Sequence, residues 1–169
     1  METLKCRMKN AECRFIIETA ALLLSCLLLS GCISFRDPVI SSLPPERQGK
    51  MYTHGEFQDY TDYGKYQYAD ITDETLQTNP HFQMVTAEDI RKLTAYLENF
   101  ESWVDEARDC ENCDLAEMYD FSPEMFREGD YFCIVNQHDS EDSVWKYSSY
   151  DVYYFSMESQ TLYYFHNNI

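Results

Sequence analysis

The clearest alternation of hydrophobic and polar positions lies between residues 87 and 108. Apolar side chains recur there at steps of three and four, as Ile90, Leu93, Leu97, Phe100, Val104 and Ala107. This spacing places them on one face of a helix. Thr86 precedes the pattern and Asp89 stands three positions later, which is the spacing of a capping box. The sequence therefore predicts an amphipathic helix from Ala87 to Arg108 that covers a core.

The C-terminal third has a different period, in which apolar and polar residues alternate. Tyr150–Glu158 and Thr161–Asn167 are rich in Tyr, Phe and Val, and Ser159-Gln160 between them fits a tight hairpin. A further strand is predicted from Tyr131 to Gln137, and a weaker one near residues 144–148. The expected fold is α+β, with one long amphipathic helix packed on an antiparallel sheet of three to four C-terminal strands.

Two other segments have weaker patterns. Phe57, Tyr60, Tyr63 and Tyr66 fall three apart, which favours a short helix within residues 51–70. Residues 109–120 form an acidic stretch without periodicity and are expected to be a loop. Ser122-Pro123-Glu124 can begin a helical turn, because proline is tolerated at the first helical position.

The N-terminal segment has the features of an export signal. A basic start is followed by an apolar run from Ala20 to Leu29 and then by Ser30, Gly31 and Cys32. Leu29-Ser30-Gly31-Cys32 resembles the lipobox of bacterial lipoproteins. That resemblance implies cleavage before Cys32 and membrane attachment through diacylglycerol, with acyl chains such as palmitate, on the Cys32 thiol. Met8 is an alternative start that leaves the box unchanged.

These features divide the chain into three parts. Residues 1–31 are expected to be a lipoprotein signal peptide, 32–50 a flexible tether rich in Pro and Ser, and 51–169 a single α+β domain. The apolar run of the signal is shorter than the ~20 residues that cross a bilayer. The expected location is the extracytoplasmic face of the cell membrane. If the host has two membranes, Ile33 after the lipidated cysteine favours delivery to the outer membrane.

Composition narrows the classes of partner. The chain carries 30 acidic and 13 basic residues, a formal net charge of −17. Such a charge repels phosphate backbones, so nucleic-acid binding is excluded, whereas a basic protein or a metal cation would be attracted. The 14 Tyr and 10 Phe residues argue against disorder, because disordered chains are poor in aromatic residues. A folded, acidic domain follows.

Three cysteines remain after Cys32, and they leave two alternatives open. Cys110 and Cys113 form a Cys-x-x-Cys pair, for which a disulfide is the simplest product outside the cytoplasm. Alternatively, the pair could join Cys133 and His138 in a zinc site, although only one compact ligand pair is present. Thiol redox catalysis is disfavoured, because the acidic neighbours of the pair raise thiol pKa values.

No catalytic motif is complete. His54-Gly55-Glu56 with the later Cys-x-x-Cys resembles in outline the signature of zinc deaminases, but Asp109 stands where that signature has proline. The chain has no nucleophile elbow, no His-Glu-x-x-His and no phosphate-binding loop. His81, His138 and His166 each stand without a motif partner. We therefore assign no catalytic residue and no cofactor, and favour a non-enzymatic function.

The globular part is similar to small uncharacterised lipoproteins of Gram-positive bacteria. The residues that carry this resemblance are Gly129-Asp130-Tyr131-Phe132 and the closing run from Thr161 to Ile169. It implies no known activity. The leading hypothesis is a lipid-anchored domain that binds a basic protein or a glycan. The alternatives are a small envelope enzyme or metal-binding module that uses the Cys110/Cys113 loop, and an immunity or inhibitor protein against a basic toxin or hydrolase.

Overall fold

The computed structural model describes residues 37–55, 59–110, 113–136 and 147–168, so Cys32 and the predicted lipobox lie outside the described residues. The chain divides into two compact units, Met1–Ile40 and Ser41–Ile169. A short helix, α2 (Pro38–Ser41), begins in the first unit, where Asp37 Oδ1 accepts hydrogen bonds from the backbone N–H groups of Val39 and Ile40. Among the described residues, no helix is both long and apolar enough to span a bilayer.

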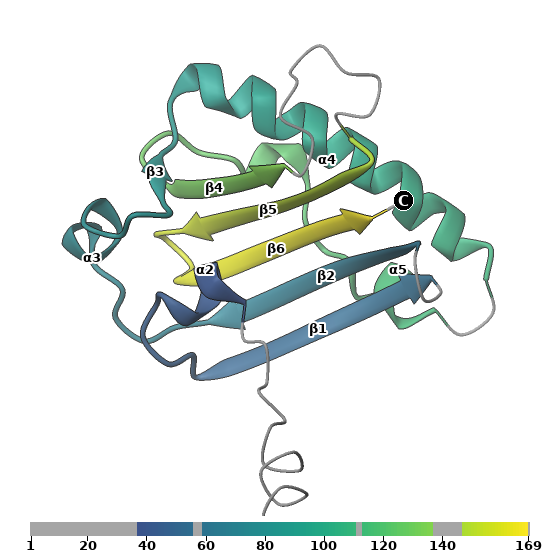
Figure 1. Cartoon of the computed structure of the whole chain (residues 1–169), viewed down its shortest axis with the longest axis horizontal. Coiled ribbons are helices and arrows are strands. Elements are labelled where there is room, and N and C mark those ends of the chain that lie inside the picture. Colours follow the sequence, from purple (N-terminus) through teal and green to yellow (C-terminus); the bar gives the residue numbers. More distant parts are fainter. Residues whose placement is uncertain (1–36, 56–58, 111–112, 137–146, 169) are drawn as a thin grey trace, which may run out of the picture. The chain divides into compact units, whose positions relative to one another are not determined.

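The second unit is built on one antiparallel sheet whose six strands lie in the order β1-β2-β6-β5-β4-β3 (Figure 1). The strands are β1 (Gln48–Gly55), β2 (Tyr60–Gln67), β3 (Gln83–Met84), β4 (Tyr131–Asn136), β5 (Ser149–Ser156) and β6 (Thr161–Asn168). The predicted α+β class with one long helix is confirmed. The expected number of three to four strands is wrong, because β1, β2 and the short β3 were not foreseen.

β1 and β2 replace the short helix expected within residues 51–70. In a strand, side chains alternate between faces, so a step of three turns a residue to the opposite side of the sheet. Tyr63 is fully buried on one face, whereas Tyr66 lies on the other. β2 pairs with both β1 and β6, which satisfies its backbone groups along its whole length. β1 begins at Gln48, inside the range expected to be tether.

The long helix α4 (Ala87–Arg108) has the predicted bounds and the predicted capping box. The Thr86 hydroxyl accepts a hydrogen bond from Asp89 N–H, and the Asp89 carboxylate accepts one from Thr86 N–H. Its apolar face packs on the sheet, with the Phe100 ring 5.3 Å from that of Phe165 on β6 (Figure 1). The acidic stretch after α4 contains a short helix, α5 (Asp114–Met118), and η1 (Pro123–Met125) forms the expected turn.

The opposite face of the sheet is covered at one end by the segment that contains α3 (Asp73–Gln77). The Tyr131 hydroxyl donates to Asp73 Oδ1 at 3.0 Å. The Tyr68 ring lies 5.7 Å from the ring of Phe155. The sheet therefore has buried aromatic residues on both faces. The segment that contains α3 covers one end of the face opposite α4, so only the rest of that face is available to a ligand.

The β5–β6 hairpin is confirmed, but its turn is longer than the two residues expected. Ser156 pairs with Thr161, so residues 157–160 form the turn. Gln160 adopts a positive φ of 52°, which is unusual for a side chain other than glycine. Its side-chain amide bonds both backbone groups of Ile71 and the carbonyl of Met157, which holds this conformation.

Candidate functional site

The predicted Cys110 and Cys113 lie beside His54, which the sequence had grouped with them only in the disfavoured outline of the deaminase signature. Cys110 follows α4, Cys113 is the N-cap residue of α5, and His54 lies near the end of β1. Cys113 Sγ is 3.4 Å from His54 Nδ1, and Cys110 Sγ is 4.0 Å from Nε2 of the same ring. The fold thus brings together residues more than fifty positions apart.

A small hollow opens beside these thiols. It encloses about 150 Å³ and is lined by Ala107, Arg108, Cys110, Cys113, Ala116 and Glu117. Cys110 is exposed and Cys113 is partly buried. In the described conformation, no three histidine, cysteine or carboxylate side chains of the described residues are arranged to hold a metal ion.

Cys133 does not lie near this pair. It is on β4, paired with Tyr153 of β5, and three strands separate β4 from β1. His138, the fourth member of the predicted zinc set, lies outside the described residues. Cys110 and Cys113 are not disulfide-bonded in the described structure, and the disulfide between them stays a prediction.

A larger groove lies between β1, β2 and α5, and sequence reasoning missed it. It encloses about 260 Å³ and is lined by Gln48, Lys50, Tyr52, Lys65, Gln67 and Met118. Lys50 and Lys65 are direct cross-strand partners, and so are Gln48 and Gln67. Gln48, Lys50 and Tyr52 stand at alternate positions, as in a strand, but a tether was expected over residues 32–50.

Of the two lysines, Lys65 has a fixed counter-ion in Asp120. Lys65 Nζ donates to Asp120 Oδ2 at 2.5 Å, and the Tyr63 hydroxyl donates to Asp120 Oδ1 at 2.7 Å. Partial burial of Asp120 opposes its ionisation, but the hydrogen bonds from Lys65 and Tyr63 outweigh burial and lower its pKa. Lys50 has no ion pair with any other described residue, so its charge is available to a ligand.

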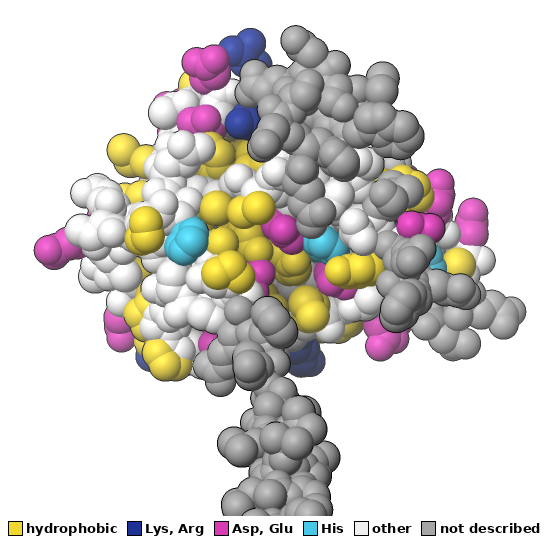
Figure 2. All heavy atoms as spheres, viewed as in Figure 1, with side chains coloured by type: hydrophobic (Ala, Val, Ile, Leu, Met, Phe, Trp, Pro, Cys, Tyr) yellow, Lys and Arg dark blue, Asp and Glu magenta, His cyan; other side chains and the backbone are white. Residues whose placement is uncertain are grey.

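The sheet face opposite α4 carries a row of polar residues in register across four strands. Thr53, Asp62, His166 and Asp151 are successive partners on β1, β2, β6 and β5. His166 Nδ1 lies 2.7 Å from Asp151 Oδ1, which also accepts a hydrogen bond from the Tyr164 hydroxyl. Figure 2 shows hydrophobic side chains gathered over the strands, with acidic and histidine side chains among them.

His166, which has no partner in a sequence motif, has Asp151 as its partner in this row. His166 is 6% exposed and Asp62 is 7% exposed. His166 Nε2 and Asp62 Oδ1 have no hydrogen-bond partner among the described residues. Burial raises the pKa of Asp62 despite its hydrogen bond with Thr53 and the attraction of His166. Asp151 lies opposite His166 because of the register of the β5–β6 hairpin. The two-residue turn expected from the sequence would have shifted this register.

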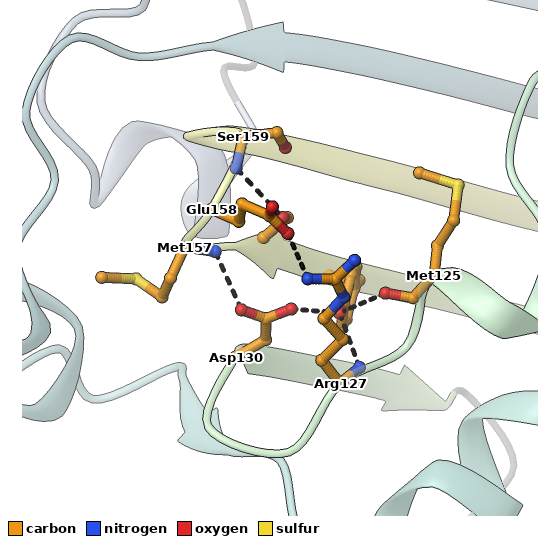
Figure 3. A network of polar contacts seen from close by, with 8 residues as sticks. Met125, Arg127, Asp130, Met157, Glu158 and Ser159 are labelled. Atoms are coloured by element: carbon orange, nitrogen blue, oxygen red, sulfur yellow. Dashed lines mark hydrogen bonds and ion pairs between the residues drawn. The ribbon is translucent and has the colours of Figure 1, made fainter.

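Asp130, which belongs to the Gly129-Asp130-Tyr131-Phe132 run, has a structural role. Its carboxylate accepts hydrogen bonds from Met157 N–H at 2.9 Å and from the Tyr154 hydroxyl, which in turn accepts one from Arg127 N–H (Figure 3). Arg127 also forms an exposed ion pair with Glu158. These bonds tie the start of β4 to the β5–β6 turn, so this run explains part of the fold and indicates no ligand site.

Comparison with known proteins adds no family. The chain matches no protein-family model, no curated protein and no solved structure. Its function must therefore be argued from its own residues.

Proposed function

We propose that this protein is a lipid-anchored extracytoplasmic binding domain that recognises an acidic sugar in the groove between β1, β2 and α5. The observation that carries the proposal is the direct cross-strand pairing of Lys50 with Lys65 along this groove. Like charges in direct opposition destabilise a sheet. Asp120 balances Lys65, and a ligand carboxylate would balance Lys50. A sugar with a single carboxylate has the required charge.

The other lining residues suit a saccharide. Gln48 and Gln67 each offer amide donors and an acceptor, which match the hydroxyl groups of a sugar. Tyr52 is partly buried and offers an aromatic ring, and Met118 adds an apolar contact that is 45% exposed. The volume of about 260 Å³ is small among ligand sites and favours one sugar unit.

The overall charge limits the ligand further. A net charge of −17 repels a polymer with an acidic group on every unit. The groove is a local exception, since Lys65 is balanced by Asp120 while Lys50 is not paired with a described residue. We therefore expect the ligand to carry isolated carboxylates in an otherwise neutral glycan.

Membrane attachment is supported by the sequence of the export signal. The Leu29-Ser30-Gly31-Cys32 box lies at the end of an apolar run of suitable length. Intact mass of the protein extracted from membranes tests this part. The expected mass begins at Cys32 and includes a diacylglycerol group, and Cys32→Ser abolishes both changes. An unmodified chain that retains residues 1–31 contradicts the attachment.

A titration followed by NMR tests the groove. The probes are a disaccharide that carries one glucuronate and the same disaccharide with glucose in its place. We expect binding of the acidic probe only, with resonances of Tyr52 and Met118 shifted. Lys50→Glu should weaken binding at least ~10-fold, because a charged hydrogen bond is replaced by repulsion.

Lys92→Glu on the exposed face of α4 is the matched control, since it changes the net charge equally but lies outside the groove. It should leave the affinity unchanged. Equal loss in both variants would mean that only overall charge matters, and equal binding of the two disaccharides would exclude recognition of the carboxylate.

A further inference from the structure

We infer that His54, Cys110 and Cys113 form a zinc-binding site at the end of the sheet where β1 meets α5. The inference is independent of the sugar groove, because the two sites share no lining residue. The three ligands come from two segments, β1 and the Cys-x-x-Cys loop, which the fold brings to one place.

The distance between Cys113 Sγ and His54 Nδ1 fits two ligands of one zinc ion. Zinc binds thiolate sulfur at about 2.3 Å and imidazole nitrogen at about 2.0–2.1 Å in tetrahedral geometry, which puts the two donors ~3.6 Å apart. Cys113 Sγ and His54 Nδ1 are 3.4 Å apart. These two atoms are therefore separated as ligands of a common ion would be.

The Cys110 thiol must move for both cysteines to bind the same ion. It lies 4.0 Å from His54 Nε2, and the two nitrogens of one ring cannot bind the same ion. Cys110 is exposed, so a change of side-chain rotamer meets little packing resistance. The Cys-x-x-Cys spacing is the one with which two thiolates converge on a single zinc ion.

The cluster of His54, Cys110 and Cys113 has an open side toward the neighbouring hollow. The hollow of about 150 Å³ next to the thiols leaves a fourth position for water, and the carboxylate of Glu117 lines the same hollow. Two thiolates and one neutral imidazole neutralise a divalent cation, so the site requires no further charge. Cys133 and His138, the partners suggested by sequence spacing, are not needed.

Zinc and a disulfide exclude one another at this pair, because each requires both sulfur atoms. Native mass spectrometry of the full chain, purified under reducing conditions and mixed with Zn²⁺, separates the two states. We expect one Zn²⁺ per chain. With Co²⁺ in its place, we expect the thiolate-to-cobalt charge-transfer absorption of a sulfur-ligated site.

Two substitutions with matched controls identify the ligands. His54→Ala and Cys113→Ser should each weaken Zn²⁺ binding by about 100-fold or more, whereas His81→Ala and Cys133→Ser should leave it unchanged. Thermal unfolding provides a second measurement, since Zn²⁺ should raise the Tm of the wild type and both controls only.

Three results would overturn the inference. One is a reduced wild-type chain that takes up no Zn²⁺. Another is equal loss of Zn²⁺ in His54→Ala and His81→Ala. The third is a chain whose Cys110 and Cys113 are disulfide-bonded after purification from its native membrane and whose reduction does not increase metal uptake.

Discussion

Asp62 and His166 are buried polar residues on neighbouring strands, and each keeps one atom without a hydrogen-bond partner among the described residues. Burying such atoms costs free energy, because the water they lose is not replaced. Asp151 compensates part of this cost for His166 through its hydrogen bond with Nδ1. Among the described residues, the Asp62 carboxylate has a hydrogen bond with Thr53 only. The row therefore makes stability depend on the protonation of Asp62.

The sign of this dependence follows from the raised pKa of Asp62. The folded chain binds this proton more tightly than the unfolded chain, in which the pKa is near 3.8. The stabilising contribution is complete below pH 3.8 and is lost as the pH rises through the raised pKa. Asp62→Asn removes this loss, so we expect the free energy of unfolding at pH 7 to increase.

Urea unfolding of the wild type and Asp62→Asn between pH 3 and 8 measures this effect, and the difference should shrink toward the acidic end. Asp59→Asn is the control, since Asp59 is exposed. A destabilised Asp62→Asn at pH 7 would mean that the attraction between Asp62 and His166 outweighs the cost of burial.

Among the elements, α4 is specified by local chemistry more completely than the strands that precede it. Its capping box satisfies two backbone N–H groups at the N-terminus, those of Thr86 and Asp89. Glu88 and Asp89 also complement the positive end of the helix dipole. β1 and β2 have no comparable local signal, because a row of tyrosines three apart matches the period of a helix and not that of a strand. Pairing with β6 decides their conformation.

Thr86→Ala tests the contribution of the cap. We expect the free energy of unfolding to fall by about 1 kcal/mol, because Asp89 N–H loses its acceptor. Chemical denaturation measures the change. Ser102→Ala on the exposed part of the same helix is the control and should change stability by less than ~0.5 kcal/mol. Equal effects at both positions would exclude a specific role of the cap.

In the molecule as a whole, stability should be highest at the centre of the sheet. β6 lies between β2 and β5, and seven of its eight residues are buried. β1 is an edge strand with mostly exposed residues. Both candidate sites include residues of β1, which places ligand binding at the least protected side of the sheet.

Native-state hydrogen exchange followed by mass spectrometry tests this gradient. Backbone amides of β5 and β6 should exchange slowest, and those of β1 should exchange at least ~10-fold faster, because local opening of an edge strand exposes fewer buried contacts. Zn²⁺ should slow exchange at the His54 end of β1, whereas the acidic disaccharide should slow it near Lys50. Uniform protection across all strands would contradict this ordering.

The candidate sites could be predicted only in part. Cys110 and Cys113 were recognised from their spacing. His54 was grouped with them only through the outline of the deaminase signature, which Asp109 contradicts. Its approach to the thiols depends on β1 lying beside α5, and the sequence pattern did not predict that arrangement. The lysine groove could not be predicted either. It requires that Lys50 and Lys65 occupy paired strands, whereas the sequence pattern favoured a tether and a short helix.

The sequence by itself determined α4, its cap and the alternation of the β5–β6 hairpin, because these depend on residues within a few positions of one another. Tertiary structure decided the rest. A four-residue turn in place of a two-residue turn shifts the pairing by two positions and puts Asp151 opposite His166, while every side chain keeps its face. Such pairings depend on cross-strand register and packing, which local spacing does not encode.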